Sequence, residues 1–388
     1  MTVERFKVHS LIGQIDRPRM HRAFQAVKRN HGAAGVDGVT LDMFEANLEQ
    51  NLAALLYDLK HAGCYSAAAV RRVYLPKGNG RWRPLGIPTV RDRVAQEVVR
   101  ALLEPIFEPT FAEGSFGFRP GRNAHQAMAC VLQFIQQGQH YILDADIQAF
   151  FDNLPHELII DRVAEQVADG HLLDLIRAFL TAPVMEDGQL HPTLKGTPQG
   201  GVISPLLANI VLDVLDQRLI QTGLRFARYA DDFVVLCPTR AAAEQARTLV
   251  AETLHALGLT LAPDKTRVVS LREGFDFLGF RIGVNGVSVR PKSLKKFKDH
   301  IRLMTRRHHN FEAETIQALN QVIRGFAQYF ATPFSTVRRQ FHDLDEWIRM
   351  RLRCMKFKRI SKWDNWRLLN RHLARLGLMS LYRFATDT

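Results

Sequence analysis

The sequence has few cysteines and no apolar stretch long enough to cross a bilayer. Only four of its 388 residues are cysteine, and no Cys-x-x-Cys pair is present. A zinc ribbon and a disulfide framework are therefore not expected. The fifteen histidines show no His-Glu-x-x-His or similar metal spacing. Apolar runs stay well below about 18–20 residues, and the start MTVERFKVHS lacks the apolar core of a signal peptide. We therefore expect a cytoplasmic protein that is not embedded in a membrane.

Acidic residues are scarce in the last quarter of the chain. Residues 285–388 hold 22 Lys+Arg and 8 Asp+Glu, a net charge of +14, whereas residues 1–284 hold 30 and 31, a net charge of −1. A surface this basic attracts polyanions, and nucleic acid is the commonest of these. A solvated helical domain that is merely basic would have the same composition. Apolar residues at 46% and charged residues at 23% exclude general disorder.

Helical and strand-like segments are interspersed without a regular strand–helix–strand alternation. This pattern favours an α+β fold over a doubly wound sheet. At roughly 100–200 residues per domain, the length suggests two or three domains. The predicted elements are two helices in 17–60 around a polar turn at 31–38, a strand at 70–76 with a hairpin turn at Gly78–Asn79–Gly80, a helix at 90–107, and strands at 141–147 and 225–236.

After about residue 285 the pattern becomes helical. Apolar residues recur every three or four positions from Leu294 to Met304, from Ile316 to Phe330 and from Leu344 to Leu352. Such stripes are expected to form the core of a helix bundle. The polar faces of these helices are predicted to carry Lys295, Lys296, Lys298, Arg302, Arg306, Arg307, Arg351, Arg353, Lys356, Lys358 and Arg359.

Aspartates interrupt two apolar runs. One run holds Asp144 and Asp146, and the other holds Asp231 and Asp232. A carboxylate among strand-forming residues is costly unless it is paired, hydrogen-bonded or metal-bound. Alternation along a strand places the first two on one face, and a hairpin turn would bring the second two to its tip. Converging carboxylates suit a pair of Mg²⁺ ions that act on a hydroxyl and a pyrophosphate leaving group, although ordinary turn aspartates would also explain an Asp-Asp pair.

Two further segments favour a nucleotide site. Residues 75–88 place cations around the predicted hairpin turn, where they could clamp a triphosphate. Residues 196–209 combine a glycine-rich turn with a probable helix start, and small residues there would let the backbone approach a nucleotide closely.

Taken in order, these segments resemble reverse transcriptases of the group II intron-encoded lineage. The resemblance runs from about residue 20 to about residue 380, and its specificity comes from the order of the blocks. The collinear blocks are Gly35–Gly38, Pro76–Pro88, Ser115–His125, Asp144–Asp152, Gly196–Gly201 with Ser204–Asn209, Tyr229–Asp232, Pro263–Thr266 and Phe277–Phe280.

The resemblance implies a right-hand polymerase with fingers, palm and thumb, the palm holding a small antiparallel sheet. Residues 1–70 would form an N-terminal extension and the start of the fingers, and residues 71–284 the fingers and palm. Residues 285–388 would form a basic helical thumb or maturase-type domain. The chain shows no H-N-H endonuclease with its cysteine pairs, so self-sufficient DNA integration is not expected.

The resemblance also implies roles for individual residues. Asp146, Asp231 and Asp232 would be the catalytic acids and, with the carbonyl of Ile147, the ligands of two Mg²⁺ ions, for which Mn²⁺ could substitute. Phe151 matches the position that excludes a 2′-hydroxyl. The remaining matches are Lys77, Arg83, Gln199 and Lys265 at the incoming dNTP, and Arg119, Lys295, Lys296, Lys298, Arg302, Arg306, Arg351, Lys356 and Lys358 at nucleic acid.

The function expected from this resemblance is RNA-directed DNA synthesis. Its partners would be an RNA template, a DNA or RNA primer and dNTPs, with a dedicated structured RNA or defence or CRISPR proteins as further candidates. The role stays open among phage defence, a CRISPR-linked system, repair and a reduced retroelement. Two alternatives are an RNA-binding intron maturase with secondary polymerase activity and a template-independent nucleotidyl transferase.

Overall fold

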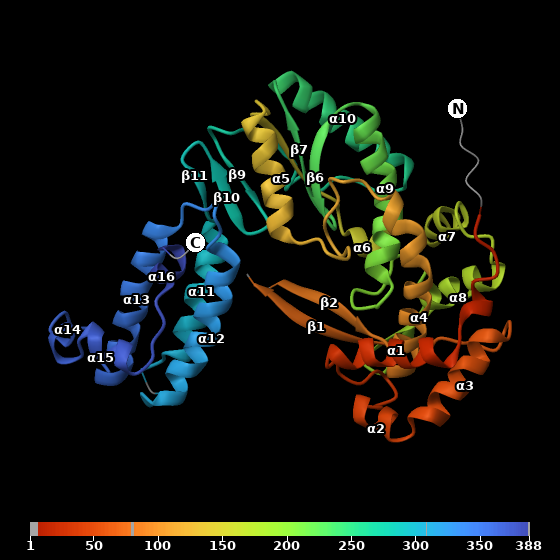
Figure 1. The fold of residues 1–388 in the computed structure, drawn as a ribbon, viewed down its shortest axis with the longest axis horizontal. Helices are drawn as coiled ribbons and strands as arrows, with labels where there is room; N and C mark the ends of the chain where they lie inside the picture. The colour runs from red at the N-terminus through yellow and green to blue at the C-terminus, as the bar shows by residue number, and fades with distance from the viewer. Residues whose placement is uncertain (1–6, 79–80, 308, 387–388) are drawn as a thin grey trace. The chain divides into compact units, whose positions relative to one another are not determined.

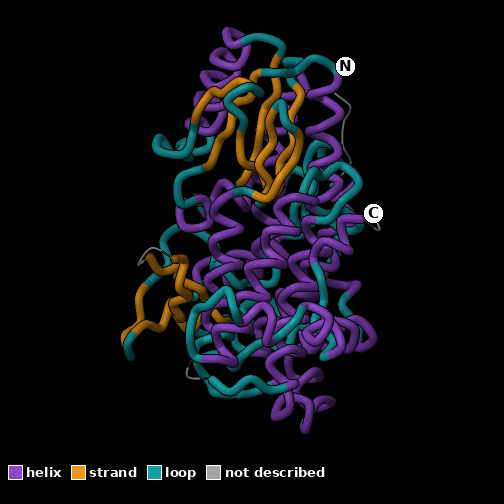
Figure 2. Tube along the Cα trace, turned by 90° about the vertical axis from the view of Figure 1, so that its left-hand side faces the viewer, coloured by secondary structure: helices purple, strands orange, loops and turns teal. Residues whose placement is uncertain are grey.

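Most of the chain folds into helices, and its strands gather in short sheets (Figures 1 and 2). The structure, a computed structural model, describes residues 7–78, 81–307 and 309–386, and it leaves out the side chains of Lys77 and Arg81. Two units make up the described chain. The second consists of residues 138–144, 238–240 and 268–388, and the first of the remainder. Within the described residues, no helix combines the length and the apolar character that crossing a membrane requires.

The N-terminal region holds one helix more than the sequence predicts. After the short η1 (Ile12–Gln14), α1 spans Arg17–Arg29, α2 Leu41–Ala46 and α3 Leu48–Lys60. The prediction of a single helix after the polar turn is wrong because Asn47 leaves helical geometry, at φ −123° and ψ 39°. This break lets Phe44 stack on Phe24 at 5.6 Å between ring centroids.

A long hairpin follows these helices. Strands β1 (Val70–Gly78) and β2 (Arg81–Ile87) pair antiparallel, with Leu75 opposite Arg83. The predicted turn residues Asn79 and Gly80 lie outside the described residues. Two short strands, β4 (Val184–Glu186) and β5 (Gln189–His191), extend the sheet in the order β2-β1-β4-β5.

The helix after this hairpin has the predicted bounds. It is α4 (Val90–Phe107), and its N-cap Thr89 accepts a hydrogen bond from the backbone of Asp92. The short η2 (Glu108–Thr110) follows it.

A second four-stranded sheet carries the acidic segments. Its order is β6 (Arg225–Tyr229), β7 (Asp232–Cys237), β3 (Tyr141–Asp146) and β8 (Arg267–Ser270). The segment predicted as one strand at 225–236 is therefore a hairpin. The helices of this region are α5 (Ala124–Gln136), α6 (Phe150–Asn153), α7 (His156–Ala164), α8 (Gly170–Thr181), α9 (Ser204–Gln221) and α10 (Arg240–Ala256).

Helices pack around the β6–β7 hairpin. Helix α5 lies against β6, as Figure 1 shows. Helix α9 is apolar around most of its circumference, and Leu207, Val211 and Leu215 are fully buried. A helix of this kind belongs in the middle of a domain, so it supplies a rigid base for the acidic turn.

The C-terminal part of the second unit has a small sheet before its helices. Strands β9 (Phe275–Phe277), β10 (Phe280–Gly283) and β11 (Gly286–Val289) have the order β11-β10-β9. The boundary predicted at 284–285 falls in the turn between β10 and β11. The helices are α11 (Pro291–Met304), α12 (Ala313–Phe330), α13 (Arg338–Phe357), α14 (Asp364–Arg367), α15 (Asn370–Arg375) and α16 (Leu381–Thr386).

The predicted apolar stripes form the core of these helices. Ile301, Ile323 and Leu352 are buried to 1% exposure or less. One prediction for the polar faces is wrong, because Arg353 is also buried. Its guanidinium donates to the carbonyl of Leu368 at 2.9 Å and to the side chain of Asn370 at 2.6 Å. A long side chain on a mostly polar helix can thus turn inward where backbone carbonyls of a neighbouring segment accept its donors.

Candidate active site

Asp146 ends strand β3 and is held there by a loop from far along the chain. The amide of Ala262 donates to the carbonyl of Asp146 at 2.8 Å, and the amide of Gln148 donates to the carbonyl of Thr260 at 2.9 Å. This pairing brings Lys265 to the site. Its ammonium donates to both carboxylate oxygens of Asp146, at 2.9 and 2.8 Å. Lys265, predicted to act near the dNTP, is therefore an ion-pair partner of a predicted catalytic acid.

Asp231 lies in a two-residue turn between β6 and β7. Tyr229 pairs with Asp232 across the hairpin, which leaves Ala230 and Asp231 as the turn. Ala230 adopts a left-handed backbone with φ 59°, the sign that tight hairpin turns require. The predicted hairpin tip is thus present, with Asp231 in the turn and Asp232 as the first residue of β7.

The environment of Asp231 opposes its negative charge. Burial raises the pKa of its carboxyl group, and the neighbouring Asp146 raises it further, while Arg83 and Lys265 act in the opposite direction. A carboxylate whose charge is opposed by burial and by a neighbouring acid is stabilised when a cation binds beside it. Arg83, from β2, is close enough to take part in this balance.

These residues partly fit a divalent metal. Asp146 and Asp231 provide the hard oxygen donors that Mg²⁺ prefers, in a setting where a cation would relieve the charge repulsion. Among the described residues, however, no group of three or more His, Cys, Asp or Glu side chains is arranged to hold one metal ion. The pair Asp146–Asp231 is therefore the part of the predicted ligand set that the structure gathers.

The acidic turn is supported by Arg228, which the sequence analysis did not single out. Arg228 and its partner Asp216 are fully buried. The guanidinium donates to Asp216 through Nε at 2.8 Å and through Nη2 at 2.5 Å. Its Nη1 donates to the carbonyl of Ala230 at 3.0 Å and to Asn209 at 2.9 Å. Arg228 therefore fixes the left-handed residue directly before Asp231.

A glycine segment packs against the same turn from another side. Phe116 donates its amide to the carbonyl of Arg228 at 2.8 Å, and Arg228 donates its own to Gly114 at 2.8 Å. A Cβ on Gly117 would lie 2.3 Å from the amide nitrogen of Ala230, so only glycine fits there. Gly117 within the Ser115–His125 block was the sequence feature that could have indicated this contact. The sequence does not show which residue a glycine packs against.

Phe151 and Gln199 are brought together by main-chain hydrogen bonds. The amide of Thr197 donates to the carbonyl of Phe151 at 2.8 Å, which attaches the glycine-rich loop to α6. The amide of Gly86 donates to the carbonyl of Gln199 at 2.8 Å, which attaches the same loop to β2. Phe151 is half-buried, unlike its neighbour Phe150, which is 2% exposed. The loop thus links the hairpin that carries Arg83 to the residue predicted to contact the sugar.

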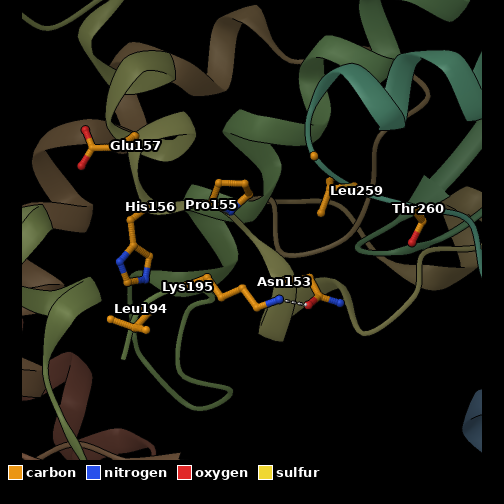
Figure 3. A pocket seen from close by; sticks show the side chains of 9 residues that line it. Asn153, Pro155, His156, Glu157, Leu194, Lys195, Leu259 and Thr260 are labelled. Atoms are coloured by element: carbon orange, nitrogen blue, oxygen red, sulfur yellow. Dashed lines mark hydrogen bonds between the residues drawn. The ribbon is translucent and has the colours of Figure 1, made fainter. Parts of the chain in front are cut away.

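A cavity of about 580 Å³ lies behind this attachment (Figure 3). His156 forms a hydrogen bond of 2.8 Å between Nε2 and the carbonyl of Gly196. Lys195 donates to the side chain of Asn153 at 2.9 Å. The opposite wall is the loop that ends at Thr260. These contacts hold the start of the glycine-rich loop against the segment that follows α6.

A family model described as "Reverse transcriptase (RNA-dependent DNA polymerase)" matches residues 75–282, which include every residue of this site. The chain belongs to the reverse transcriptase family. Its fold is accordingly that of a right-hand polymerase. A second model, "Group II intron, maturase-specific domain", matches residues 294–376.

Curated relatives include a group II intron-encoded protein. The chain is 36% identical over 287 residues to Protein YkfC of Escherichia coli K12, covering 64% of this chain and 75% of that protein. It is 39% identical over 207 residues to the group II intron-encoded protein LtrA of Lactococcus lactis subsp. cremoris, covering 53% of this chain but only 34% of LtrA. A solved structure of telomerase from Candida albicans aligns with 86% of this chain and 65% of its own at 13% identity, with a TM-score of 0.45.

In this reverse transcriptase Arg119, predicted to contact nucleic acid, has the geometry of a structural residue. It is buried, and it donates through Nη1 to the carbonyls of Ala112 and Ser115, at 2.6 and 2.9 Å. Its Nε and Nη2 contact the carboxylate of Glu108, at 3.0 and 2.8 Å. With its donors directed at protein acceptors, Arg119 holds the start of the Gly114–Gly117 segment in place. The predicted nucleic-acid contact stays a prediction.

The remaining predicted cations differ in whether they contact other groups of the protein. Lys295, Lys296 and Arg306 are exposed on or just after α11. Arg351 instead donates to the hydroxyl and carbonyl oxygens of Thr305, at 3.1 and 2.7 Å. The others have the following contacts: Lys298 and Arg302 lie over the ring of Trp347, Lys356 lies over Phe311, and Lys358 caps α13 and donates to the carbonyl of His309. The side chain of Lys77, predicted at the dNTP, lies outside the described residues.

Proposed function

We propose that this reverse transcriptase extends a primer with dNTPs on an RNA template, using the site around Asp146 and Asp231. The observation that carries this proposal is the convergence of these two carboxylates with Arg83 and Lys265. RNA binding alone would not require acids that repel each other at the end of a strand and the tip of a hairpin. Nucleotidyl transfer does, because the reacting groups are anionic and need cations between them.

Two Mg²⁺ ions would be held by Asp146 and Asp231, with Asp232 and the carbonyl of Ile147 as the further predicted ligands. When bound, such ions stabilise developing charge on phosphoryl oxygens and favour the ionised form of an attacking hydroxyl. The protein's own residues would bind the triphosphate and position the metal ligands. Arg83 offers a cation to the triphosphate, and the rigid turn beside Arg228 holds Asp231 in one position.

Selection of deoxynucleotides is proposed for Phe151. Its carbonyl anchors the loop of Gln199, so its ring is attached to the same frame that would position the base. A bulky ring beside the sugar leaves no room for a 2′-hydroxyl. Phe151→Ala is therefore expected to incorporate ribonucleotides, while Phe151→Tyr, which keeps the ring, should still reject them. Equal discrimination by wild type and Phe151→Ala would contradict this role.

The experiment that tests the function is primer extension by the purified chain with Mg²⁺. It should compare RNA and DNA templates, dNTPs and NTPs, and reactions with and without a template or a chelator. We expect extension that follows the template sequence, uses dNTPs and stops when the metal is chelated. Extension that ignores the template would instead support a template-independent nucleotidyl transferase.

A maturase activity is the second candidate, favoured by the match to the maturase-specific domain over residues 294–376. In that case the chain would bind an intron RNA and promote its splicing. The two activities separate in Asp231→Asn, which should lose primer extension and keep RNA binding. Splicing of a group II intron RNA by this variant would support the second activity, and absence of splicing by wild type on several intron RNAs would argue against it.

A further inference from the structure

Two tryptophans near the end of the second unit lie in solvent. Trp363 is 76% exposed and Trp366 is 78% exposed, and the neighbouring Ile360 is 67% exposed. In the part of the chain that the structure describes, neither indole ring has a ring contact, a cation partner or a hydrogen bond. Scattered surface apolar residues need no explanation. Two of the four tryptophans of the chain within four residues of each other are not scattered.

The local fold keeps both indoles outside. Asp364, between them, is fully buried and accepts from Arg359 at 3.0 Å, with Arg367 at 3.7 Å. The amide of Leu368 closes the turn on the carbonyl of Asp364 at 3.0 Å. Because Trp363 caps α14 and Trp366 is its third residue, the two side chains lie three positions apart on neighbouring surface. The aspartate that points inward therefore makes the tryptophans point outward.

Another tryptophan of the same unit shows the contrast. The ring of Trp347 is covered by Lys298 and by Arg302, each at 5.5 Å from the ring centroid. Cations over the ring face satisfy its negative quadrupole. Trp363 and Trp366 have no such cover, so their faces remain able to take a planar ligand.

The surroundings of the two indoles select an anionic partner. Residues 356–375 hold seven Lys or Arg and a single acidic residue, Asp364. Since that carboxylate is buried and paired, the exposed charge of the segment is entirely positive. Lys362 and Arg371 are among its exposed cations.

We propose that Trp363 and Trp366 form a platform on which unpaired bases of a single-stranded RNA segment stack, while the surrounding Lys and Arg bind its phosphates. Aromatic faces flanked by cations are the chemistry that binds single strands, because every base has a stacking face and every nucleotide a charge. Phosphate contacts alone would bind duplexes as well. The choice of RNA over other polyanions rests on the proposed function, and the stacking itself does not.

The test uses the full chain and a short unstructured RNA, a duplex of the same sequence, and the same strand with abasic sites. Binding is measured by fluorescence anisotropy. The double variant Trp363→Ala/Trp366→Ala should bind the base-containing strand about tenfold more weakly or worse. Its affinity for the abasic strand and its salt slope should match wild type. The matched control is Leu303→Ala, which removes a side chain that is 54% exposed on the basic helix α11 and should leave all affinities unchanged.

A second measurement makes the result independent of other RNA-binding surfaces. In a Trp82→Phe/Trp347→Phe variant, Trp363 and Trp366 are the only remaining indole fluorophores. Their emission should be quenched by the base-containing strand and not by the abasic strand. Equal quenching by both strands, or none by either, would overturn the proposal. So would a response to vesicles of phosphatidylcholine and phosphatidylglycerol without one to RNA, which would assign the indoles to a membrane surface.

Measuring primer extension beside quenching distinguishes a failure of this proposal from a failure of the proposed function. Asp231→Asn should lose primer extension and retain quenching. If wild type extends no primer yet its platform tryptophans are quenched by RNA, the polymerase proposal fails and the platform stands. If primers are extended normally and quenching is absent, the platform fails and the polymerase stands.

Discussion

Two arginines, one in each unit, pair with an aspartate in opposite ways. Arg228 and Asp216 are fully buried, and the guanidinium also donates to the carbonyl of Ala230, in the turn that holds Asp231. The side chains of Arg302 and Asp299 are 51% and 50% exposed, and their contact is between residues three apart on one helix. The Arg228–Asp216 pair is part of the protein interior, whereas the Arg302–Asp299 pair stays exposed to solvent.

The difference extends to the regions around them. Residues 1–284 are almost neutral, and some of their charges pair inside the fold, as in Arg228 with Asp216 and, in part, Arg119 with Glu108. Residues 285–388 carry a net charge of +14, much of it on exposed helix faces. The polymerase region thus uses charge to position groups, and the basic region holds charge ready for a partner.

The strongest test of this contrast removes a half-buried carboxylate that the proposed reaction needs. Asp231→Asn should lower primer extension by at least about 10³-fold, since a metal ion contributes several kcal/mol to such reactions. The same change should not destabilise the fold, because burial and Asp146 raise the pKa of Asp231 and so oppose its charge. Single-turnover rates and thermal unfolding measure the two effects. Retained synthesis would remove Asp231 from the catalytic residues, and a large loss of stability would give it a structural role instead.

The next test removes a buried charge that the fold needs. Arg228→Ala leaves Asp216 buried without its partner and should cost about 3–5 kcal/mol of unfolding free energy. Its matched control is Arg302→Ala, which breaks an exposed pair and should cost less than about 1 kcal/mol. Urea denaturation of both variants gives the comparison. Similar costs would show that the two pairs do not differ as their burial indicates.

A third test concerns Asp213, a half-buried acid on α9. Burial and the nearby Asp216 raise the pKa of Asp213 from 3.8 to about 6. The protonated form is therefore favoured in the folded state, and its contribution is complete below about pH 4 and lost as the pH rises through 6. Asp213→Asn should be more stable than wild type above pH 6, by no more than about 3 kcal/mol, and equal to it near pH 4.

The control for Asp213 is Glu252→Gln, because both residues line the same cavity of about 620 Å³ while Glu252 is exposed. This variant should follow the wild-type melting temperature at every pH. A difference between Asp213→Asn and wild type that does not change between pH 4 and pH 8 would contradict the raised pKa.

The smallest effect on stability is expected for the exposed cations of the basic region. Lys295→Gln/Lys296→Gln/Arg306→Gln should change unfolding free energy by less than about 0.5 kcal/mol. It should weaken RNA binding and lower the slope of log affinity against log salt by roughly 0.7–0.9 per lost phosphate contact. Anisotropy titrations at several salt concentrations measure both. An unchanged slope would show that this face does not contact the backbone of the nucleic acid.

Local patterns in the sequence predicted much of the fold. The bounds of α4 follow from the cap at Thr89 and an apolar period, and the buried stripes of α11 to α13 follow from spacing alone. The hairpin at Asp231 was one of two possibilities, because the apolar run around the Asp-Asp pair also fits a single strand. The break at Asn47 was missed because helix propensity continues through it, and packing between Phe24 and Phe44 decides where the chain bends.

For the site, the order of motifs named the acids and the loops but not their contacts. The sequence could not show that Lys265 binds Asp146, because the two lie 119 positions apart. It also assigned Arg119 to nucleic acid, whereas the fold surrounds that guanidinium with acceptors.

By itself, the sequence determined most of the segments that become helices and strands, where charge accumulates and which family the acidic motifs resemble. These properties depend on neighbours a few positions away. Only the tertiary structure decided that Arg228 supports the turn of Asp231, that Gly117 must lack a side chain, and that Trp363 and Trp366 face solvent. The physical reason is that burial and the choice of hydrogen-bond partner arise from contacts between distant segments. The hydrogen bond from Arg228 to Ser115, which lies 113 positions away in the sequence, is one such contact.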